Sequence, residues 1–133
     1  MGSNSFEAES LRVVDGDDIV WRNTRYRLAG YDTPEIKNFR SKKDKALEWR
    51  RGQQARLRLE TLIAGARSVH LIEWGTVVFP NRQLATLLID GWDVATIATD
   101  EGWAADYKDR KQIDWGDRRR KFPDLPVPAG VDE

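Results

Sequence analysis

Residues 10–35 read SLRVVDGDDIVWRNTRYRLAGYDTPE, and this stretch decides the fold that the sequence predicts. Apolar residues alternate as far as Val13-Val14, and the Asp15-Gly16 pair that follows is a strong signal for a tight turn between antiparallel strands. A second turn is expected at residues 22–24, and Pro34 ends the pattern. The stretch therefore predicts a meander of three short strands, over residues 10–14, 19–21 and 25–29.

The chain after Pro34 predicts one long helix, two more strands and two short helices. Residues 36–45 form a polar, lysine-rich loop, and residues 46–64 place apolar side chains at helical spacing with arginines mostly elsewhere on the wheel. Strands are predicted over residues 68–74 and 83–90, and helices over residues 94–101 and 107–115. Five short strands with a helix between the third and the fourth are typical of an OB-fold, a five-stranded barrel. The predicted fold class is therefore a β-barrel with about three helices, in the α+β class.

Length and composition indicate one domain and exclude several kinds of site. The chain has 133 residues and no cysteine, which excludes a disulfide framework, zinc ribbons and thiol nucleophiles. Its single histidine excludes any site within one chain that needs two histidines. No apolar run approaches the roughly 18 residues that span a membrane, and no signal-peptide pattern is visible. We expect a flexible or vector-derived segment over residues 1–7, a domain over residues 8–116, and a basic and then proline-rich, irregular tail over residues 117–133.

The charges cancel in the total but cluster along the chain. There are 22 Lys and Arg residues against 22 Asp and Glu residues. Residues 21–60 carry twelve basic and five acidic residues, a net charge of +7, and residues 106–122 carry seven and four, a net charge of +3. Clustered lysine and arginine can bind phosphate, but they can equally cover the solvated faces of helices.

Two aspartates at the ends of consecutive strands suggest a metal site. Asp17 and Asp32 belong to one meander, so their carboxylates can converge. Pro34 favours an extended backbone at Thr33, which can direct the Thr33 carbonyl oxygen to the same point. Two carboxylates, a carbonyl and water molecules form an all-oxygen site that suits Ca²⁺ better than Mg²⁺.

Charged neighbours of this site suggest phosphodiester hydrolysis. Glu35 is close enough in sequence to hold or deprotonate a water molecule, and the guanidinium of Arg27 can bind phosphate oxygens in pairs. Metal, carboxylates and arginines around one point are the groups that in-line phosphodiester hydrolysis requires. No phosphate-binding loop of the Gly-x-x-x-x-Gly-Lys-Ser/Thr type is present, which argues against nucleoside triphosphate chemistry.

These motifs together resemble the staphylococcal nuclease (thermonuclease) family over about residues 11–107. The resemblance is carried by Asp15-Gly16-Asp17, Arg27, Asp32-Thr33-Pro34-Glu35 and Arg82-Gln83-Leu84-Ala85. It implies an OB-fold barrel with three helices and a Ca²⁺-dependent endonuclease that cleaves the P–O5′ bond of DNA and RNA and leaves 3′-phosphates. It also implies a monomer that acts on single-stranded or locally open substrate, and a protein that is secreted, periplasmic or anchored to a membrane.

The resemblance implies a role for each matched residue. Asp17 and Asp32 would be the metal carboxylates, and Thr33 would contribute its backbone carbonyl. Glu35 would be the general base, whereas Arg27 and Arg82 would bind the phosphate and stabilise the transition state. Substrate contacts are further expected from Tyr107, which falls near the family's base-contacting tyrosines, and from Lys42 and Lys43 in the lysine-rich loop that follows the site.

Two departures from the family pattern affect the expected site. Asp18 replaces the usual Thr or Ser, and an extra carboxylate there could tighten cation binding or repel phosphate. Phe79-Pro80-Asn81 precedes Arg82 where the family more often has Tyr-Gly, which affects how Arg82 is placed. The loop over residues 36–45 is expected to be mobile and to guide the strand into the site.

Two other readings of the same residues remain open. The barrel could be a non-catalytic module that binds nucleic acid, or a module that binds another protein, with the carboxylates only forming turns. The presence of all five charged positions favours the enzyme, because degenerate members of the family lose a metal carboxylate or an arginine.

Overall fold

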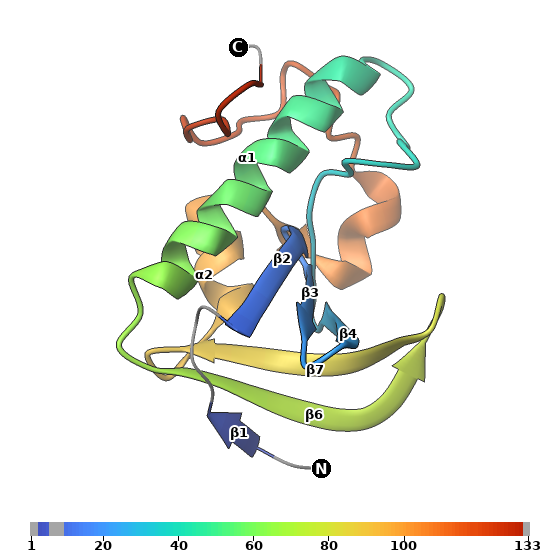
Figure 1. The fold of residues 1–133 in the computed structure, drawn as a ribbon. Coiled ribbons are helices and arrows are strands. Elements are labelled where there is room, and N and C mark those ends of the chain that lie inside the picture. The colour runs from blue at the N-terminus through green and yellow to red at the C-terminus, as the bar shows by residue number, and fades with distance from the viewer. Residues whose placement is uncertain (1–2, 6–9, 132–133) are drawn as a thin grey trace.

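The predicted meander forms the centre of the fold. A computed structural model describes residues 3–5 and 10–131. β2 (Leu11–Asp15), β3 (Asp18–Trp21) and β4 (Thr24–Leu28) are successive antiparallel strands, as Figure 1 shows. Their register sets Asp18 opposite Arg27, so the acidic turn between β2 and β3 lies beside the arginine of the family motif.

A long hairpin extends the meander into a mixed sheet. β6 (Val69–Val78) and β7 (Arg82–Ile89) are antiparallel, and β7 joins β4 in parallel. The sheet has the order β1-β6-β7-β4-β3-β2, with β1 (Ser3–Ser5) on β6 and β8 (Trp92–Asp93) on β7. A second, two-stranded sheet pairs β5 (Tyr31–Asp32) with β9 (Ala105–Asp106). Among the described residues, the pairings leave β1 and β2 as the two edges of the larger sheet.

Within residues 10–131, α1, α2 and the short helix η2 complete the fold. α1 (Lys45–Ala64) begins after Asp44, whose side chain accepts a hydrogen bond from the Leu47 N–H at 2.9 Å, and it buries Ala55, Leu59 and Ile63. α2 (Val94–Glu101) begins at the Asp93 cap and ends at Gly102, where a φ of 90° favours glycine. The short 3-10 helix η2 (Tyr107–Gln112) follows β9. In the part of the chain that the structure describes, no helix is long and apolar enough to span a membrane.

The core lies between α1 and the sheet. Its largest fully buried apolar side chains come from the strands, both α-helices and the segment after α2, and include Ile19, Leu28, Leu59, Leu71, Leu87, Val94 and Trp103. Burial of this apolar surface is the main force that holds the helices on the sheet.

The structure confirms the α+β class, the five predicted strands and the three helices. The predicted strands correspond to β2, β3, β4, β6 and β7, although β6 continues four residues beyond the predicted end. The four shorter strands were not predicted, since two or three residues cannot show an alternating pattern. The third helix ends at Gln112, three residues before its predicted end. Of the predicted N-terminal segment 1–7, residues 1–2 and 6–7 lie outside the described residues.

The C-terminal segment after η2 is irregular, as its prolines predict, and it packs along α1 (Figure 1). The guanidinium of Arg51 donates to the backbone oxygens of Trp115, Asp117 and Arg120 at 2.9, 3.0 and 3.0 Å. Further along α1, the Gln54 amide donates to the Leu125 oxygen at 2.6 Å. The segment is therefore attached to the first half of α1 by buried polar side chains.

Candidate active site

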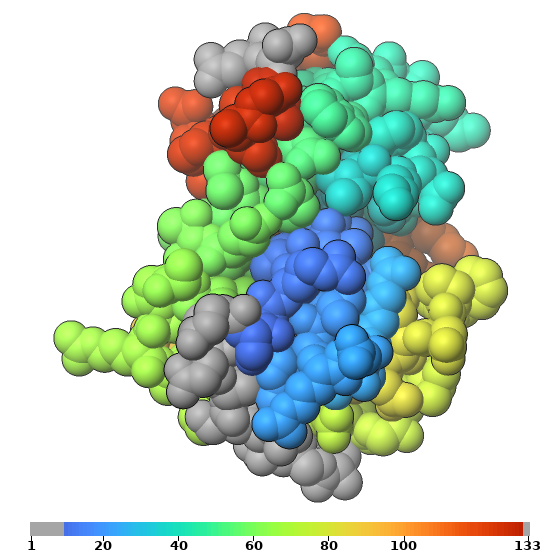
Figure 2. Space-filling view, viewed as in Figure 1, coloured from blue at the N-terminus to red at the C-terminus, as the bar shows by residue number. Residues whose placement is uncertain are grey.

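Three segments, two of them neighbours in the sequence and the third distant, meet around one cleft of about 430 Å³. They are the β2–β3 turn with β4, the loop that follows β5, and the end of the β6–β7 hairpin. In Figure 2 these segments appear in blue, cyan and yellow, and they come together at the right-hand side of the molecule. The charged side chains that line the cleft are Asp15, Asp17, Asp18, Asp32, Glu35, Arg25, Arg27, Lys37 and Arg82.

The two predicted metal carboxylates lie on either side of one arginine. Asp17 and Asp32 are both buried, and Oδ2 of Asp17 lies 3.3 Å from Nη1 of Arg27. Oδ1 of Asp32 lies 3.9 Å from Nη2 of the same arginine. The Thr33 backbone N–H donates to Oδ2 of Asp17 at 3.2 Å, which fixes the Asp32–Thr33 peptide against the turn. Asp17 and Asp32 thus converge on Arg27, and Thr33 contacts the same cluster through its backbone N–H, while the metal-ligand role of its carbonyl stays a prediction.

Arg27 is held from several directions. It donates to the backbone oxygens of Leu28 at 2.7 Å and Tyr31 at 2.8 Å, and its side chain is only 11% exposed. Burial acts to lower the pKa of Arg27, but Asp17 and Asp32 outweigh that effect and raise it. Arg27 is therefore a fixed cation at the centre of the acidic cluster.

Glu35 faces the same cluster from the loop after β5. Nη2 of Arg40 lies 3.5 Å from Oε1 of Glu35 and 2.8 Å from Oδ2 of Asp32, so one guanidinium bridges the two acids. Burial raises the pKa of Glu35 to about 7, and the charge of Asp17 adds to that effect while Arg40 opposes it. A carboxyl group with such a pKa can exchange protons near neutral pH.

A buried glutamate on α1 fixes the loop that carries Glu35. Glu48 is 1% exposed and accepts hydrogen bonds from the backbone N–H groups of Glu35, Arg40 and Ser41, at 3.4, 3.0 and 2.9 Å. One turn further along the helix, Gly52 lies so close to the loop that a Cβ there would be 2.8 Å from the Glu35 oxygen. The sequence analysis missed Glu48, because a glutamate among Lys and Arg residues is typical of a solvated helix face.

Arg82 reaches the cleft from the start of β7. Its Nη1 lies 3.0 Å from Oδ2 of Asp18, and its Nη2 donates to the Phe79 oxygen at 2.7 Å. The same Asp18 oxygen is 3.0 Å from Nη2 of Arg25. Both departures from the family pattern therefore act on Arg82, since Asp18 and Phe79 provide its hydrogen-bond acceptors.

Asp15 is a further acid of the cleft that the candidate set did not include. Its Oδ1 accepts the Asp17 N–H at 3.1 Å. Burial, followed by the neighbouring Asp17 carboxylate, raises the pKa of Asp15 well above its usual range. Its place in the Asp15-Gly16-Asp17 motif is the available signal, although the turn and the family resemblance assign no site role to Asp15 itself.

The three predicted substrate contacts differ in position. Tyr107 does not itself line the cleft, but its ring centroid lies 5.3 Å from Cζ of Arg27, which does, and its side chain is partly exposed. Lys42 and Lys43 are not among the residues that line the cleft. Lys43 pairs with Asp117 at 2.9 Å, and the Lys42 backbone N–H donates to Asp114. These lysines face the C-terminal segment, whereas Lys37 of the same loop does line the cleft.

The donor set fits a hard divalent cation. No three Asp, Glu, His or Cys side chains among the described residues form a group arranged to hold a metal ion by themselves. The predicted set needs only two carboxylates, with the Thr33 carbonyl and water as further oxygen ligands. Burial, and after it the charge of Asp17, raises the pKa values of Asp15 and Glu35. The four carboxyl groups of Asp15, Asp17, Asp32 and Glu35 also outnumber the guanidinium groups of Arg27 and Arg40 by two, which is an excess of negative charge when all are ionised. A cation bound to Asp17 and Asp32 would relieve that excess.

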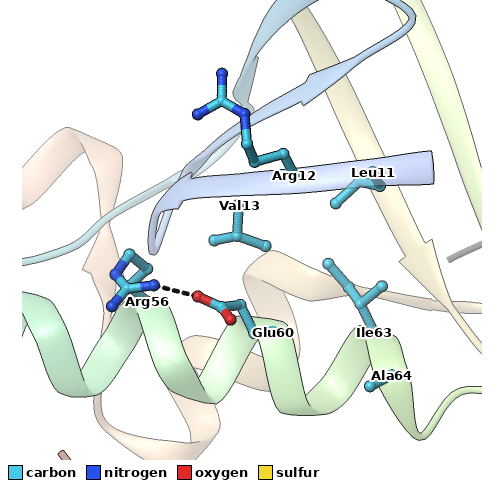
Figure 3. A pocket seen from close by; sticks show the side chains of 7 residues that line it. All are labelled: Leu11, Arg12, Val13, Arg56, Glu60, Ile63 and Ala64. Carbon is cyan, nitrogen blue, oxygen red and sulfur yellow. Dashed lines mark hydrogen bonds and ion pairs between the residues drawn. The ribbon is translucent and has the colours of Figure 1, made fainter. Parts of the chain in front are cut away.

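A second, larger hollow of about 820 Å³ lies between β2 and α1 (Figure 3). Leu11 and Val13 point toward Ile63 of the helix, whereas Arg12 points away from it. The acid in its lining, Glu60, is paired with Arg56 of the same helix. This hollow contains no cluster of acids and arginines comparable with that of the cleft.

No known family model matches the chain, and no curated protein matches it significantly.

Proposed function

We propose that the chain is a Ca²⁺-dependent nuclease of the staphylococcal nuclease type, which acts as a monomer on DNA and RNA. The observation that carries this proposal is the convergence of Asp17, Asp32, Glu35, Arg27 and Arg82 on one cleft. These residues come from segments up to 65 positions apart (82 − 17), so their meeting is not a local turn effect.

The strand order supports the corresponding barrel. The five longer strands lie side by side in the order β2-β3-β4-β7-β6, and β4 and β7 are parallel. Numbered along the chain, this is the order 1-2-3-5-4. A long connection through α1 joins the third strand to the fourth. We propose that this is an OB-type barrel, which would leave the candidate site on its surface.

Asp17, Asp32 and the Thr33 carbonyl would hold the cation. Bound there, Ca²⁺ would supply electrostatic stabilisation of the charge that develops on the phosphate oxygens. The chain's own residues would keep the two carboxylates in place, because Arg27 and the Thr33 N–H fix Asp17 and Arg27 lies beside Asp32.

Glu35 would accept the proton of the attacking water. The water oxygen forms a bond to phosphorus, the P–O5′ bond breaks, and the 5′ oxygen leaves as a hydroxyl after protonation by solvent. A pKa of about 7 suits this role, since the carboxylate is present at neutral pH and is basic enough to take a proton.

Arg82 and Arg27 would bind the phosphate. Arg82 is the more accessible of the two, at 19% exposure against 11% for Arg27. A guanidinium that is already fixed by Asp18 and the Phe79 carbonyl needs no reorganisation in the transition state.

A cleavage assay tests the proposal. The protein is incubated with single-stranded DNA, duplex DNA and RNA in Ca²⁺ and, separately, in a chelator. We expect chelator-sensitive cleavage with 3′-phosphate products, which Asp32→Ala abolishes and Glu35→Gln lowers by about 10²–10⁴. Arg82→Ala should lower turnover by about 10²–10³. Arg12→Gln removes an exposed arginine outside the cleft and should leave cleavage unchanged.

Absence of chelator-sensitive cleavage of all three substrates would rule out the enzyme. Retained binding of single-stranded DNA would then favour the non-catalytic nucleic-acid-binding module.

A further inference from the structure

Two arginines on one wall of the cleft share a single carboxylate. Asp18 is 2% exposed, and its Oδ2 lies 3.0 Å from Nη2 of Arg25 and 3.0 Å from Nη1 of Arg82. Nε of Arg25 also donates to Oδ1 of Asp18 at 3.4 Å. The two guanidinium nitrogens are therefore at most 6.0 Å apart (twice 3.0 Å) and belong to one hydrogen-bonded unit.

This unit carries surplus positive charge, unlike the arginines beside the predicted metal carboxylates. Two guanidinium groups and one carboxylate leave a net charge of +1. Arg27, in contrast, lies between two aspartates, and Arg40 bridges two acids. An incoming anion is therefore attracted to the wall formed by Arg25 and Arg82.

Arg25 also has donors available for a ligand. Its contacts to Asp18 use Nε and Nη2, and within residues 10–131 no hydrogen bond is recorded from its Nη1. Its side chain is 47% exposed and lines the cleft. A guanidinium that is held on one edge and open on the other can bind a phosphate without losing its position.

We propose that Arg25, held beside Arg82 by Asp18, binds the phosphodiester next to the one that is cleaved. The proposal rests on the proposed function, in which Arg82 contacts the scissile phosphate. It assigns Arg25 to a second phosphate subsite and makes the substrate a strand with at least two consecutive phosphodiesters.

Asp18 is the positioning residue of this subsite. Without its charge, two guanidinium groups within 6.0 Å (twice 3.0 Å) would repel each other in a partly buried place. The Asp18 carboxylate thus allows Arg25 to lie in the cleft together with Arg27 and Arg82, and it neutralises one of their positive charges.

Binding of short oligonucleotides tests the subsite. The protein carries Glu35→Gln to suppress turnover, and calorimetry in Ca²⁺ measures its affinity for oligothymidylates of two, three and six nucleotides without terminal phosphates. These ligands carry one, two and five phosphodiesters. The comparison is then repeated after adding Arg25→Gln and, as the matched control, Arg12→Gln, whose arginine points away from α1 and lies outside the cleft (Figure 3).

We expect affinity to rise between two and three nucleotides, and Arg25→Gln to remove most of that rise. For the hexanucleotide, Arg25→Gln should weaken binding about 5- to 20-fold and reduce the slope of log K against log salt concentration by about 0.7, the value for one contact to a single strand. Arg12→Gln should change neither quantity appreciably.

An Arg25→Gln effect that is absent, or equal for two and for six nucleotides, would overturn the subsite. Cleavage by the wild-type protein separates this outcome from failure of the proposed function. Cleavage without a length-dependent Arg25 effect refutes the subsite alone, whereas length-dependent binding without cleavage supports a two-phosphate binding site at Arg25 and Arg82 but refutes the enzyme and, with it, the subsite as defined. Failure of every oligonucleotide to bind would overturn the subsite, and the cleavage assay would still decide the enzyme.

Discussion

Arg40 binds the same Asp32 carboxylate that the proposed metal site requires, with Nη2 2.8 Å from Oδ2. The guanidinium comes from the loop before α1 and is partly exposed, whereas Asp32 is buried. Trp115 approaches the same oxygen from the C-terminal segment, with Nε1 at 3.4 Å. One oxygen of Asp32 is thus bonded by two segments that the sequence motif does not include.

Arg40→Gln should therefore increase Ca²⁺ affinity. Arg40 and a divalent cation compete for Asp32, and an ion pair as exposed as this one contributes at most about 1 kcal/mol, so we expect up to about a fivefold tighter Kd. Calorimetric titration with Ca²⁺ alone measures the effect. Arg118→Gln breaks an exposed pair with Asp44 outside the cleft and should leave the Kd unchanged. An unchanged or weaker affinity in Arg40→Gln would show that Arg40 does not compete with the cation.

Glu48→Gln should destabilise the protein and slow cleavage. Glu48 accepts hydrogen bonds from three backbone N–H groups. A glutamine can accept some of these bonds through its carbonyl oxygen, but its NH₂ group is a donor and cannot accept the others. We expect a loss of about 1–3 kcal/mol in the free energy of unfolding, measured by urea denaturation. Glu60→Gln on the same helix disrupts only a partly exposed pair with Arg56 and should cost less than about 1 kcal/mol. Equal effects of the two substitutions would contradict the role assigned to Glu48.

Gly52→Ala should displace the loop that carries Glu35. A Cβ at this position would lie 2.8 Å from the Glu35 oxygen and 2.9 Å from the Pro34 oxygen, and both are backbone atoms. Overpacking of this kind costs about 1–3 kcal/mol, and turnover should fall more than binding because Glu35 is moved. Gly65→Ala is the matched control, since its Cβ would have 3.4 Å to the nearest atom and its φ of −90° suits alanine. Normal turnover in Gly52→Ala would mean that the loop adjusts without moving Glu35.

The raised pKa of Glu35 predicts how stability changes with pH in a chelator. The folded protein holds this proton up to about pH 7, whereas the unfolded chain releases it near the ordinary value of 4.5. The folded state therefore binds more protons between these values, and stability falls as pH rises through that window. Glu35→Gln removes the titration, so its stability relative to the wild type should increase by about 1–3 kcal/mol from pH 4 to pH 8. Asp15 titrates in both proteins, and its contribution cancels in the difference.

Urea denaturation of both proteins at several pH values measures this difference. A difference that stays constant across the range would show that Glu35 has an ordinary pKa in the folded protein.

The elements that could be predicted are those with a turn signal or a regular spacing of apolar residues in the sequence. The β2–β3 turn followed from Asp15-Gly16, and α1 followed from apolar spacing at Ala55, Leu59 and Ile63, all of which are buried. The proximity of Asp17 and Asp32 was predicted from their positions near the ends of meander strands, although Asp32 lies in β5, which pairs with β9 outside the meander. β5 and β9 could not be predicted, because pairing between two-residue strands depends on tertiary contacts rather than local preference.

The less predictable residues are charged side chains whose partners are distant in sequence. Glu48 and Arg51 lie three positions apart on α1 in a strongly charged stretch, and both are buried. Their partners are backbone groups of the loop before α1 and of the C-terminal segment. The helical spacing of apolar residues predicts which face of a helix is buried. It cannot identify a charged side chain that is buried because backbone groups form hydrogen bonds with it. Lys42 and Lys43 do not line the cleft for a related reason, since Asp114 and Asp117 bind that part of the loop, and their contact with substrate stays a prediction.

The attachment of the C-terminal segment to Arg51 has a practical consequence for protein engineering. A chain shortened before Trp115 would lose the indole beside Asp32 and leave the Arg51 guanidinium without its three carbonyl acceptors. Truncation there would thus disturb an acid of the cleft that is 83 positions away in the sequence (115 − 32). A purification tag or fusion partner that follows the complete C-terminal segment leaves these contacts intact.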